Sequence, residues 1–193
     1  MNSTKKNRLM DKGAIKRAVD RLALEIAENF PGDDLTEMAL LGIQSRGVFL
    51  AQRLMVRLEE LTGNRPLFGK IDTSMYRDDI GMRKTLPTIL ETRIPFEVNE
   101  RHIVLVDDVL WTGRTIRAAL DAITDYGRPE TIRLAVLMER KGREFPIHAE
   151  YVGMKCAVSR KKRVYVKLEE SDGEDAVYVK LYADEQKKSE SES

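Results

Sequence analysis

One stretch near the middle of the chain, residues 103–115, constrains the fold most strongly. It reads Ile-Val-Leu-Val-Asp-Asp-Val-Leu-Trp-Thr-Gly-Arg-Thr and is followed by a helical repeat of apolar residues from Ile116 to Tyr126. Four consecutive aliphatic residues predict a buried strand of a parallel sheet, and the two aspartates place charge at its carboxyl end. A loop and a helix follow. We therefore expect an α/β fold built around this strand, loop and helix.

The loop after this strand is suited to binding a phosphate group. The free backbone N–H groups of the first helical turn, the positive end of the helix dipole and two threonine hydroxyls meet there. Gly113 lets the backbone approach phosphate oxygens closely, while Asp107 and Asp108 can accept hydrogen bonds from vicinal hydroxyls. A phosphate beside a diol indicates a ribose phosphate. The simpler alternative is a doubly wound sheet whose aspartates only cap a helix.

A second strand and helix repeat this arrangement earlier in the chain. Met38–Ile43 is a short apolar run, and Gln44-Ser45-Arg46-Gly47 leads from it into an amphipathic helix that continues to Leu58. An arginine beside exposed amides at a helix start predicts a second anion site. Two other nucleotide-binding motifs are excluded. Residues 63–70 have one residue too many for a P-loop and continue with isoleucine, and the dinucleotide fingerprint G-x-G-x-x-G is absent.

Residues 103–115 resemble the phosphoribosyl pyrophosphate (PRPP) signature of type I phosphoribosyltransferases, in the form found in the pyrimidine operon attenuator family, PyrR. The resemblance extends from about Asp11 to about Leu181, and the segment Tyr-Arg-Asp-Asp at residues 76–79 is another specific part of it. It implies the type I phosphoribosyltransferase fold, which is a central, mostly parallel sheet flanked by helices, with a flexible hood and a C-terminal β-hairpin. We expect one domain over residues 1–183, a hood at about 75–97 and a disordered polar tail at 184–193.

The resemblance also implies roles for individual residues, and the PRPP-binding set covers both loops. That set comprises Ser45, Arg46, Asp107, Asp108, Val109, Leu110, Trp111, Thr112, Gly113, Arg114 and Thr115. The expected catalytic residues are Asp107, Asp108, Arg46, Tyr76 and Arg77. The last two would shield the reacting centre from water and add charge near the pyrophosphate.

Two further segments correspond to the part of the family's pocket that holds the base. Residues 139–147 read Glu-Arg-Lys-Gly-Arg-Glu-Phe-Pro-Ile, where relatives usually have Asp-Arg-Gly-His-Arg-Glu-Leu-Pro-Ile. Residues 154–159 read Met-Lys-Cys-Ala-Val-Ser and match a segment that supplies main-chain contacts to uracil. Arg140 and Cys156 are therefore the expected base-binding residues, in a pocket whose lining departs from the family pattern. Cys156 as a nucleophile is disfavoured, because it has no histidine partner nearby in the sequence.

The reaction implied is uracil plus PRPP giving UMP and pyrophosphate. Mg²⁺ would arrive with PRPP, so no direct protein metal site is expected. Relatives assemble as homo-oligomers, either dimers or tetramers. The family also binds the leader of pyrimidine operon mRNA in response to UMP, and the candidate RNA-binding residues here are Lys16, Arg17, Arg21 and Arg143. Positions that tend to be basic or histidine in RNA-binding relatives are Leu24, Asn29, His148 and Met154 in this chain.

Two alternatives stay open. One is a UMP-sensing, RNA-binding attenuator with little catalysis, and the other is a purine phosphoribosyltransferase. The formal net charge of +1 gives no global electrostatic case for nucleic acid, so RNA binding would need a local patch. The single cysteine, the lack of a long apolar run and the polar N-terminal segment predict a cytoplasmic protein without a membrane segment.

The remaining elements are expected from periodicity and turn residues. Asp11 should cap a helix that ends near Asn29. Further strands are predicted at residues 67–74 and 131–138, and a C-terminal edge hairpin should join residues 164–168 to 176–181 through a turn at 171–173.

Overall fold

Five parallel strands form the central sheet, in the order β3-β2-β4-β5-β6. The computed structural model describes residues 7–32, 34–78 and 90–181. The strands are β2 (Met38–Ile43), β3 (Leu67–Ile71), β4 (His102–Leu110), β5 (Thr131–Arg140) and β6 (Tyr151–Cys156). β4 lies in the middle of the sheet, where Val104 is in register with Leu40 of β2 and Arg133 of β5. The predicted parallel sheet around this strand is confirmed.

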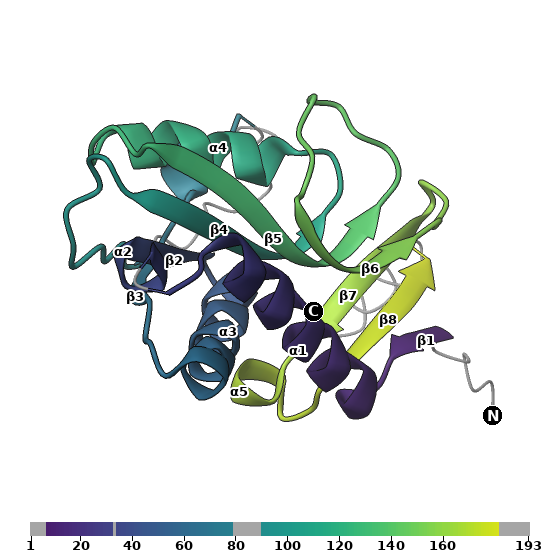
Figure 1. Ribbon diagram of the computed structural model, residues 1–193. Coiled ribbons are helices and arrows are strands. Elements are labelled where there is room, and N and C mark those ends of the chain that lie inside the picture. The colour runs from purple at the N-terminus through teal and green to yellow at the C-terminus, as the bar shows by residue number, and fades with distance from the viewer. Residues whose placement is uncertain (1–6, 33, 79–89, 182–193) are drawn as a thin grey trace.

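Helices cover both faces of this sheet (Figure 1). α1 (Lys12–Asn29) and α3 (Arg46–Thr62) lie on one face, and α4 (Arg114–Thr124) lies on the other. Each face has its own apolar cluster. Ile15, Leu54 and Val104 belong to the cluster under α1 and α3, whereas Ile116 and Leu105 belong to the one under α4. Successive residues of β4 thus point to opposite faces, and both are buried, which explains its unbroken aliphatic run.

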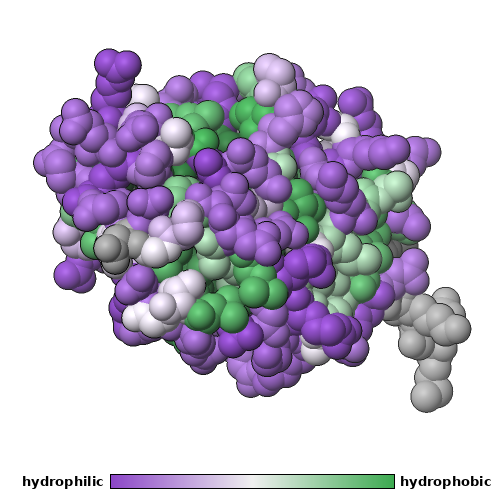
Figure 2. All heavy atoms as spheres, in the orientation of Figure 1, coloured by the Kyte–Doolittle hydropathy of each residue, from purple (hydrophilic) through white to green (hydrophobic). Residues whose placement is uncertain are grey.

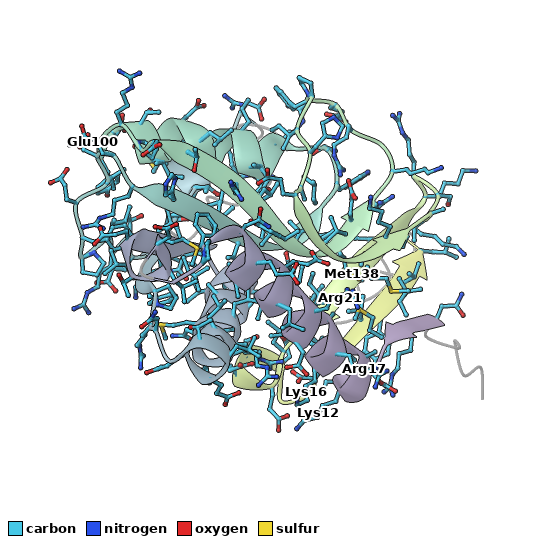
Figure 3. The ribbon with its side chains drawn as sticks, in the orientation of Figure 1. Lys12, Lys16, Arg17, Arg21, Glu100 and Met138 are labelled. Atoms are coloured by element: carbon cyan, nitrogen blue, oxygen red, sulfur yellow. The ribbon has the colours of Figure 1, made fainter. Side chains whose placement is uncertain are left out.

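The first long helix forms as its sequence predicts. Asp11 is the N-cap, and its side chain accepts a hydrogen bond of 2.8 Å from the backbone N–H of Ala14. Its buried face carries Ile15, Ala18, Val19, Leu22, Ala23 and Ile26. Its exposed side presents Lys16, Arg17 and Arg21 (Figure 3).

The C-terminal hairpin forms, but the expectation of an edge hairpin was incomplete, because one of its strands lies in the middle of a sheet. β7 (Lys162–Lys167) and β8 (Ala176–Leu181) are antiparallel, and β1 (Asn7–Met10) pairs with the other side of β8. These strands make a second, three-stranded sheet, separate from the central one. Val164, Val166, Val177 and Val179 turn into the cluster under α1, which fixes the sheet there. The polar N-terminal segment gave no sign of β1.

Several boundaries differ from the expectations. β4 continues through both aspartates to Leu110, and β3 ends at Ile71, before a short helix η1 (Ser74–Tyr76). The turn in the C-terminal hairpin is a short helix, α5 (Glu169–Asp172), and another short helix, α2 (Asp34–Glu37), precedes β2. The middle of the expected hood, residues 79–89, and the expected tail at 184–193 lie outside the described residues.

The surface seen in Figure 2 is mostly polar, with apolar side chains visible only in small areas between charged ones. Among the helices that the structure describes, none is both long enough and apolar enough to cross a membrane.

Candidate active site

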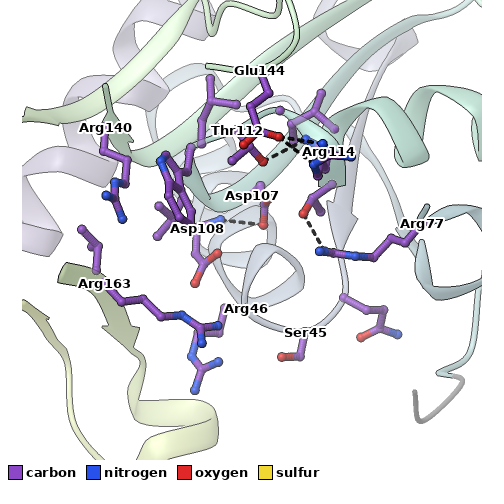
Figure 4. A pocket seen from close by; sticks show the side chains of 18 residues that line it. Ser45, Arg46, Arg77, Asp107, Asp108, Thr112, Arg114, Arg140, Glu144 and Arg163 are labelled. Atoms are coloured by element: carbon purple, nitrogen blue, oxygen red, sulfur yellow. Dashed lines mark hydrogen bonds and ion pairs between the residues drawn. The ribbon is translucent and has the colours of Figure 1, made fainter. Parts of the chain in front are cut away.

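A pocket of about 600 Å³ opens where β2 and β4 end and α3 and α4 begin (Figure 4). Ligands of parallel α/β sheets bind at this carboxyl edge. The pocket is lined by Gln44, Ser45, Arg46, Arg77, the continuous run 107–116, Arg140, Glu144, Arg163 and Val164. All eleven residues predicted to bind PRPP are in this lining, so the structure brings both predicted loops to one site.

The loop between β4 and α4 is held in place by its own backbone. Gly113 is the N-cap of α4 and has a φ of 93°, a left-handed conformation that favours glycine. A Cβ atom at this position would lie 3.2 Å from Cβ of Phe145. The carbonyl of Thr112 accepts hydrogen bonds of 2.9 Å and 3.1 Å from the backbone N–H groups of Glu144 and Phe145. The segment after β5 therefore fixes the loop from outside.

Side chains complete this phosphate loop, by which we mean residues 112–115. The guanidinium of Arg77 donates a hydrogen bond of 2.8 Å to the hydroxyl of Thr115, which brings a positive charge to the loop. The Arg114 side chain instead forms ion pairs with Asp78 at 2.6 Å and Glu144 at 2.7 Å. The loop thus offers backbone N–H groups, hydroxyls and Arg77 to an anion, with Arg114 bracing its outer side.

Asp107 and Asp108 form an acid pair at the floor of the pocket. Asp107 is only 7% exposed, and its Oδ1 accepts a hydrogen bond of 2.9 Å from the backbone N–H of Asp108. Burial and the neighbouring charge of Asp108 raise the pKa of Asp107 well above its ordinary value, which Arg77 partly opposes. Burial also raises the pKa of Asp108, against the lowering effect of Arg46. A ligand that supplies donors or positive charge would satisfy both groups.

The second loop, residues 44–47, brings Arg46 to the opposite end of the pocket. Gly47 makes this possible, because a Cβ atom there would lie 2.4 Å from the carbonyl oxygen of Val106 in β4. The start of α3 is thereby pressed against the central strand. The guanidinium of Arg46 is held by Asp172 of α5 through bonds of 2.8 Å and 3.2 Å. Arg163 of β7 lies near Arg46 in the pocket (Figure 4).

Arg140 lines the pocket but is almost fully buried in its wall. It is 1% exposed and lies 4.1 Å from the centre of the Trp111 ring. Its guanidinium donates to the carbonyl groups of Lys162 at 3.0 Å and Ser159 at 3.1 Å. This residue, predicted to contact the base, therefore also joins β5 to the segment before β7.

Two of the predicted catalytic and base-binding residues, Tyr76 and Cys156, are not in the pocket lining. The hydroxyl of Tyr76 donates to the carboxylate of Asp125, whereas its neighbour Arg77 enters the pocket. Cys156 is half-buried at the end of β6, and burial raises the pKa of its thiol, an effect that Arg140 partly opposes. A raised pKa keeps the thiol protonated at neutral pH, in agreement with the argument against a cysteine nucleophile.

The candidate RNA-binding residues are in two places. Lys16, Arg17 and Arg21 are exposed on α1, where Lys16 pairs with Asp20 at 2.8 Å and Arg21 donates to the carbonyl of Gly153. Arg143 is separate from them. Its guanidinium pairs with Glu139 at 2.6 Å and donates to backbone carbonyls that include those of Leu110 and Trp111. It therefore braces the wall of the pocket.

Comparison with known proteins identifies the family. A family model described as the phosphoribosyl transferase domain matches residues 6–169. A relative from Roseiflexus sp. (strain RS-1), named Bifunctional protein PyrR, is 48% identical over 172 residues, which cover 89% of this chain and 93% of the relative. The protein of the same name from Clostridioides difficile (strain 630) is 46% identical, covering 91% of this chain and 98% of that protein. This chain belongs to the PyrR family.

Solved structures share the fold of this PyrR family member. A hypoxanthine phosphoribosyltransferase of Trypanosoma cruzi superposes with a TM-score of 0.73, covering 99% of this chain and 100% of that one at 18% identity. A hypoxanthine-guanine phosphoribosyltransferase from Bacillus anthracis gives a TM-score of 0.66, also at 18% identity, with coverage of 91% and 98%. The expected type I phosphoribosyltransferase fold is therefore confirmed.

Sequence reasoning missed five residues of this pocket as site residues, namely Gln44, Ile116, Glu144, Arg163 and Val164. The alternation of side chains along β7 is a sequence signal that could have identified Arg163. Val164 and Val166 face the core in β7, so Arg163 and Tyr165 must face the other way.

The pocket suits the Mg²⁺ that phosphoribosyltransferases of this fold generally use with PRPP. The carboxylates of Asp107 and Asp108 are hard oxygen donors, as this cation prefers. Among the residues described, no group of three or more acidic, histidine or cysteine side chains could hold a metal ion by itself. Two carboxylates fit a cation that obtains its remaining ligands from substrate and water.

Proposed function

We propose that this protein transfers the phosphoribosyl group of PRPP to uracil, giving UMP and pyrophosphate. The observation that carries the proposal is that the phosphate loop, the acid pair and Arg46 all line one pocket. Figure 4 shows Asp107 and Asp108 between Thr112 and Arg46, an order that suits a ribose with a phosphate on one side and a second anion on the other. Membership of the PyrR family supports uracil as the base.

The phosphate loop would hold the 5′-phosphate. Its backbone N–H groups lie at the start of α4, where the helix dipole favours an anion. Arg77 and Thr115, already joined by a hydrogen bond of 2.8 Å, would close around the same group. Because the carbonyl of Thr112 is fixed by the segment after β5, little reorganisation is needed when the phosphate arrives.

The acid pair would hold the ribose and the cation. Asp107 and Asp108 can accept hydrogen bonds from the 2′ and 3′ hydroxyls and can serve as ligands, directly or through water, of the Mg²⁺ that accompanies PRPP. When bound, Mg²⁺ neutralises charge on the pyrophosphate. The carboxylates fix the position of the ribose, and their negative charge favours the positive charge that develops on its ring.

Bond cleavage needs positive charge at the leaving group. As the bond between C1 of the ribose and the pyrophosphate oxygen breaks, that oxygen gains negative charge, and Arg46 lines the same end of the pocket. N1 of uracil bonds to C1 as the bond from C1 to the pyrophosphate oxygen breaks, and the N1 proton passes to solvent. The mechanism needs no covalent nucleophile, which suits the protonated state of Cys156.

The direct test uses purified protein, PRPP and Mg²⁺ with uracil, hypoxanthine or xanthine in separate reactions. We expect nucleotide only with uracil, and an Asp107→Asn variant should make almost none. Formation of IMP or XMP in preference to UMP would contradict the assignment of the base. Binding of UMP or PRPP without any product would instead favour a ligand-sensing regulator.

A second function is the binding of pyrimidine operon mRNA. Two observations favour it. Relatives of this chain are named bifunctional, and α1 presents Lys16, Arg17 and Arg21 on its exposed side (Figure 3). Such cations grip phosphates in a salt-dependent way. A gel shift with leader RNA, with and without UMP, should show binding that the substitution of all three by glutamine abolishes. Equal binding by that variant would place the RNA elsewhere.

We also propose that the protein assembles as a dimer or a tetramer. Sedimentation of the same samples would test this.

A further inference from the structure

The short acidic segment 169–175, between β7 and β8, forms ion pairs with two arginines of α3. Asp172 binds Arg46, and the pair Glu170 and Asp175 binds Arg53 through four bonds of 2.6 to 2.9 Å. The two arginines have different surroundings. Arg46 lines the active-site pocket, whereas Arg53 does not. The segment therefore makes one contact at the site and a comparable contact away from it.

Asp172 is itself held firmly in place. Its Oδ2 accepts hydrogen bonds of 3.1 Å from the backbone N–H of Leu168 and 2.7 Å from the hydroxyl of Ser171. Its side chain is 17% exposed. Burial alone would raise the pKa of Asp172, but the bonds from Arg46, Ser171 and Leu168 outweigh burial and bring that pKa to about 2. The carboxylate is thus a fixed anion at neutral pH.

The contact between the two side chains sets the direction of the guanidinium. Asp172 accepts from Nε and Nη2 of Arg46, at 3.2 Å and 2.8 Å, in a side-on pair. Nη1 stays outside this pair. A side-on pair fixes the plane of the guanidinium, because two parallel bonds remove its freedom to rotate. Among the described residues Nη1 makes no hydrogen bond, and because Arg46 lines the pocket, Nη1 can donate to a ligand there.

We propose that Asp172 is a positioning residue, which orients Arg46 to bind the pyrophosphate group of PRPP and to stabilise pyrophosphate as it leaves. The inference rests on the proposed function and adds a residue from the C-terminal hairpin to it. Asp172 reaches the reaction only through Arg46. Its effect should therefore be confined to ligands that carry a pyrophosphate group.

The test compares ligands that differ in that group. Asp172→Asn should raise KM for PRPP and the inhibition constant of pyrophosphate about tenfold each. A guanidinium that points in another direction loses its contact with the pyrophosphate group of both ligands. The affinity for UMP, whose phosphate binds at the phosphate loop, should change less than about twofold on the same reasoning. PRPP and UMP binding are also measured directly by calorimetry. Equal weakening of all three ligands, or unchanged kinetics, would overturn the proposal, and so would tighter binding of PRPP.

Two further variants separate positioning from general stability. Asp175→Asn weakens the Arg53 contact and should lower Tm without the selective loss for PRPP and pyrophosphate. Arg46→Ala combined with Asp172→Asn should be no worse than Arg46→Ala alone, because Asp172 acts through Arg46. Additive losses would contradict this. A wild-type protein that neither binds PRPP nor makes UMP refutes the proposed function instead, so the two failures are distinguishable.

Discussion

The two ends of the active-site pocket are built in different ways. The phosphate loop is one continuous segment, 112–115, whose shape follows from a glycine in a left-handed conformation and from backbone hydrogen bonds. At the other end, Arg46 depends on an ion pair with Asp172, which is 126 residues away in the chain. The first end is local and held by backbone, and the second is assembled from distant side chains. Substitution, pH and salt should therefore act on them differently.

The largest expected effect is at the acid pair between the two ends. Asp107→Asn should reduce kcat/KM on the order of 100- to 1000-fold, because the ribose and the cation lose a charged partner. The same variant should raise Tm. The folded-state pKa of Asp107 lies well above its unfolded value, so ionising it at neutral pH costs stability that asparagine does not lose. Thermal unfolding and steady-state kinetics together check this.

A variant at the neighbouring position gives the comparison for that result. Burial also raises the pKa of Asp108, but this residue is more exposed than Asp107 and Arg46 opposes the effect. Asp108→Asn should therefore stabilise the protein less than Asp107→Asn. A fall in Tm for Asp107→Asn would contradict the account of the acid pair.

A change in the phosphate loop should weaken every ligand that carries a 5′-phosphate. Gly113→Ala places a side chain at a φ of 93° and 3.2 Å from Phe145. We expect kcat/KM for PRPP and the affinity for UMP to fall together, by roughly 100-fold, because the backbone N–H groups move. Gly63→Ala is the matched control. Gly63 also has a left-handed φ, of 77°, but has open space around it, so only about 1 kcal/mol of stability should be lost. A Gly113→Ala loss confined to PRPP would contradict this account.

A smaller effect concerns stability at the arginine end. The folded-state pKa of Asp172 is about 2, below the ordinary value of an aspartate. A lowered pKa contributes stability that is fully present above the unfolded pKa and is lost as pH falls through the folded one. Asp172→Asn should therefore cost roughly 1–2 kcal/mol at pH 7, and the difference from wild type should shrink between about pH 4 and pH 2. Urea unfolding at several pH values measures this. A difference that is constant over that range would show that the ion pair contributes nothing.

The smallest effect is that of salt. The Arg46 side chain is 35% exposed, so added salt should screen its attraction for pyrophosphate. Between low salt and about 0.5 M, KM for PRPP should rise roughly two- to threefold more than the dissociation constant of UMP. Parallel titrations with sodium chloride measure the ratio. Identical salt dependence for the two ligands would remove the proposed difference between the ends.

The same contrast explains what the sequence could predict. The strand, loop and helix at 103–124 are consecutive, and both periodicity and loop chemistry are legible there. Residues 107–115 of that segment made up most of the predicted site, and all of them line the pocket. The strand boundary was less clear, because β4 carries its two aspartates inside the strand.

Residues brought in from elsewhere were harder to predict. Nothing local in the sequence pairs Asp172 with Arg46, or places Arg163 beside it. Those contacts depend on the second sheet. The first strand of that sheet lies in a polar segment, whose sequence did not predict a strand. Arg140 and Arg143 were expected from the resemblance, yet their guanidinium groups bind backbone carbonyls within the pocket wall. Burial of an arginine among carbonyl groups leaves no signature in a single sequence.

The most direct test of the whole account is a crystal structure of the protein with UMP. The account predicts the phosphate of UMP against the backbone N–H groups of residues 112–115, with the ribose hydroxyls facing Asp107 and Asp108 and the Arg46 end free of ligand. A phosphate bound at Arg46 and Ser45 instead, with the 112–115 loop empty, would contradict the assignment of the two ends.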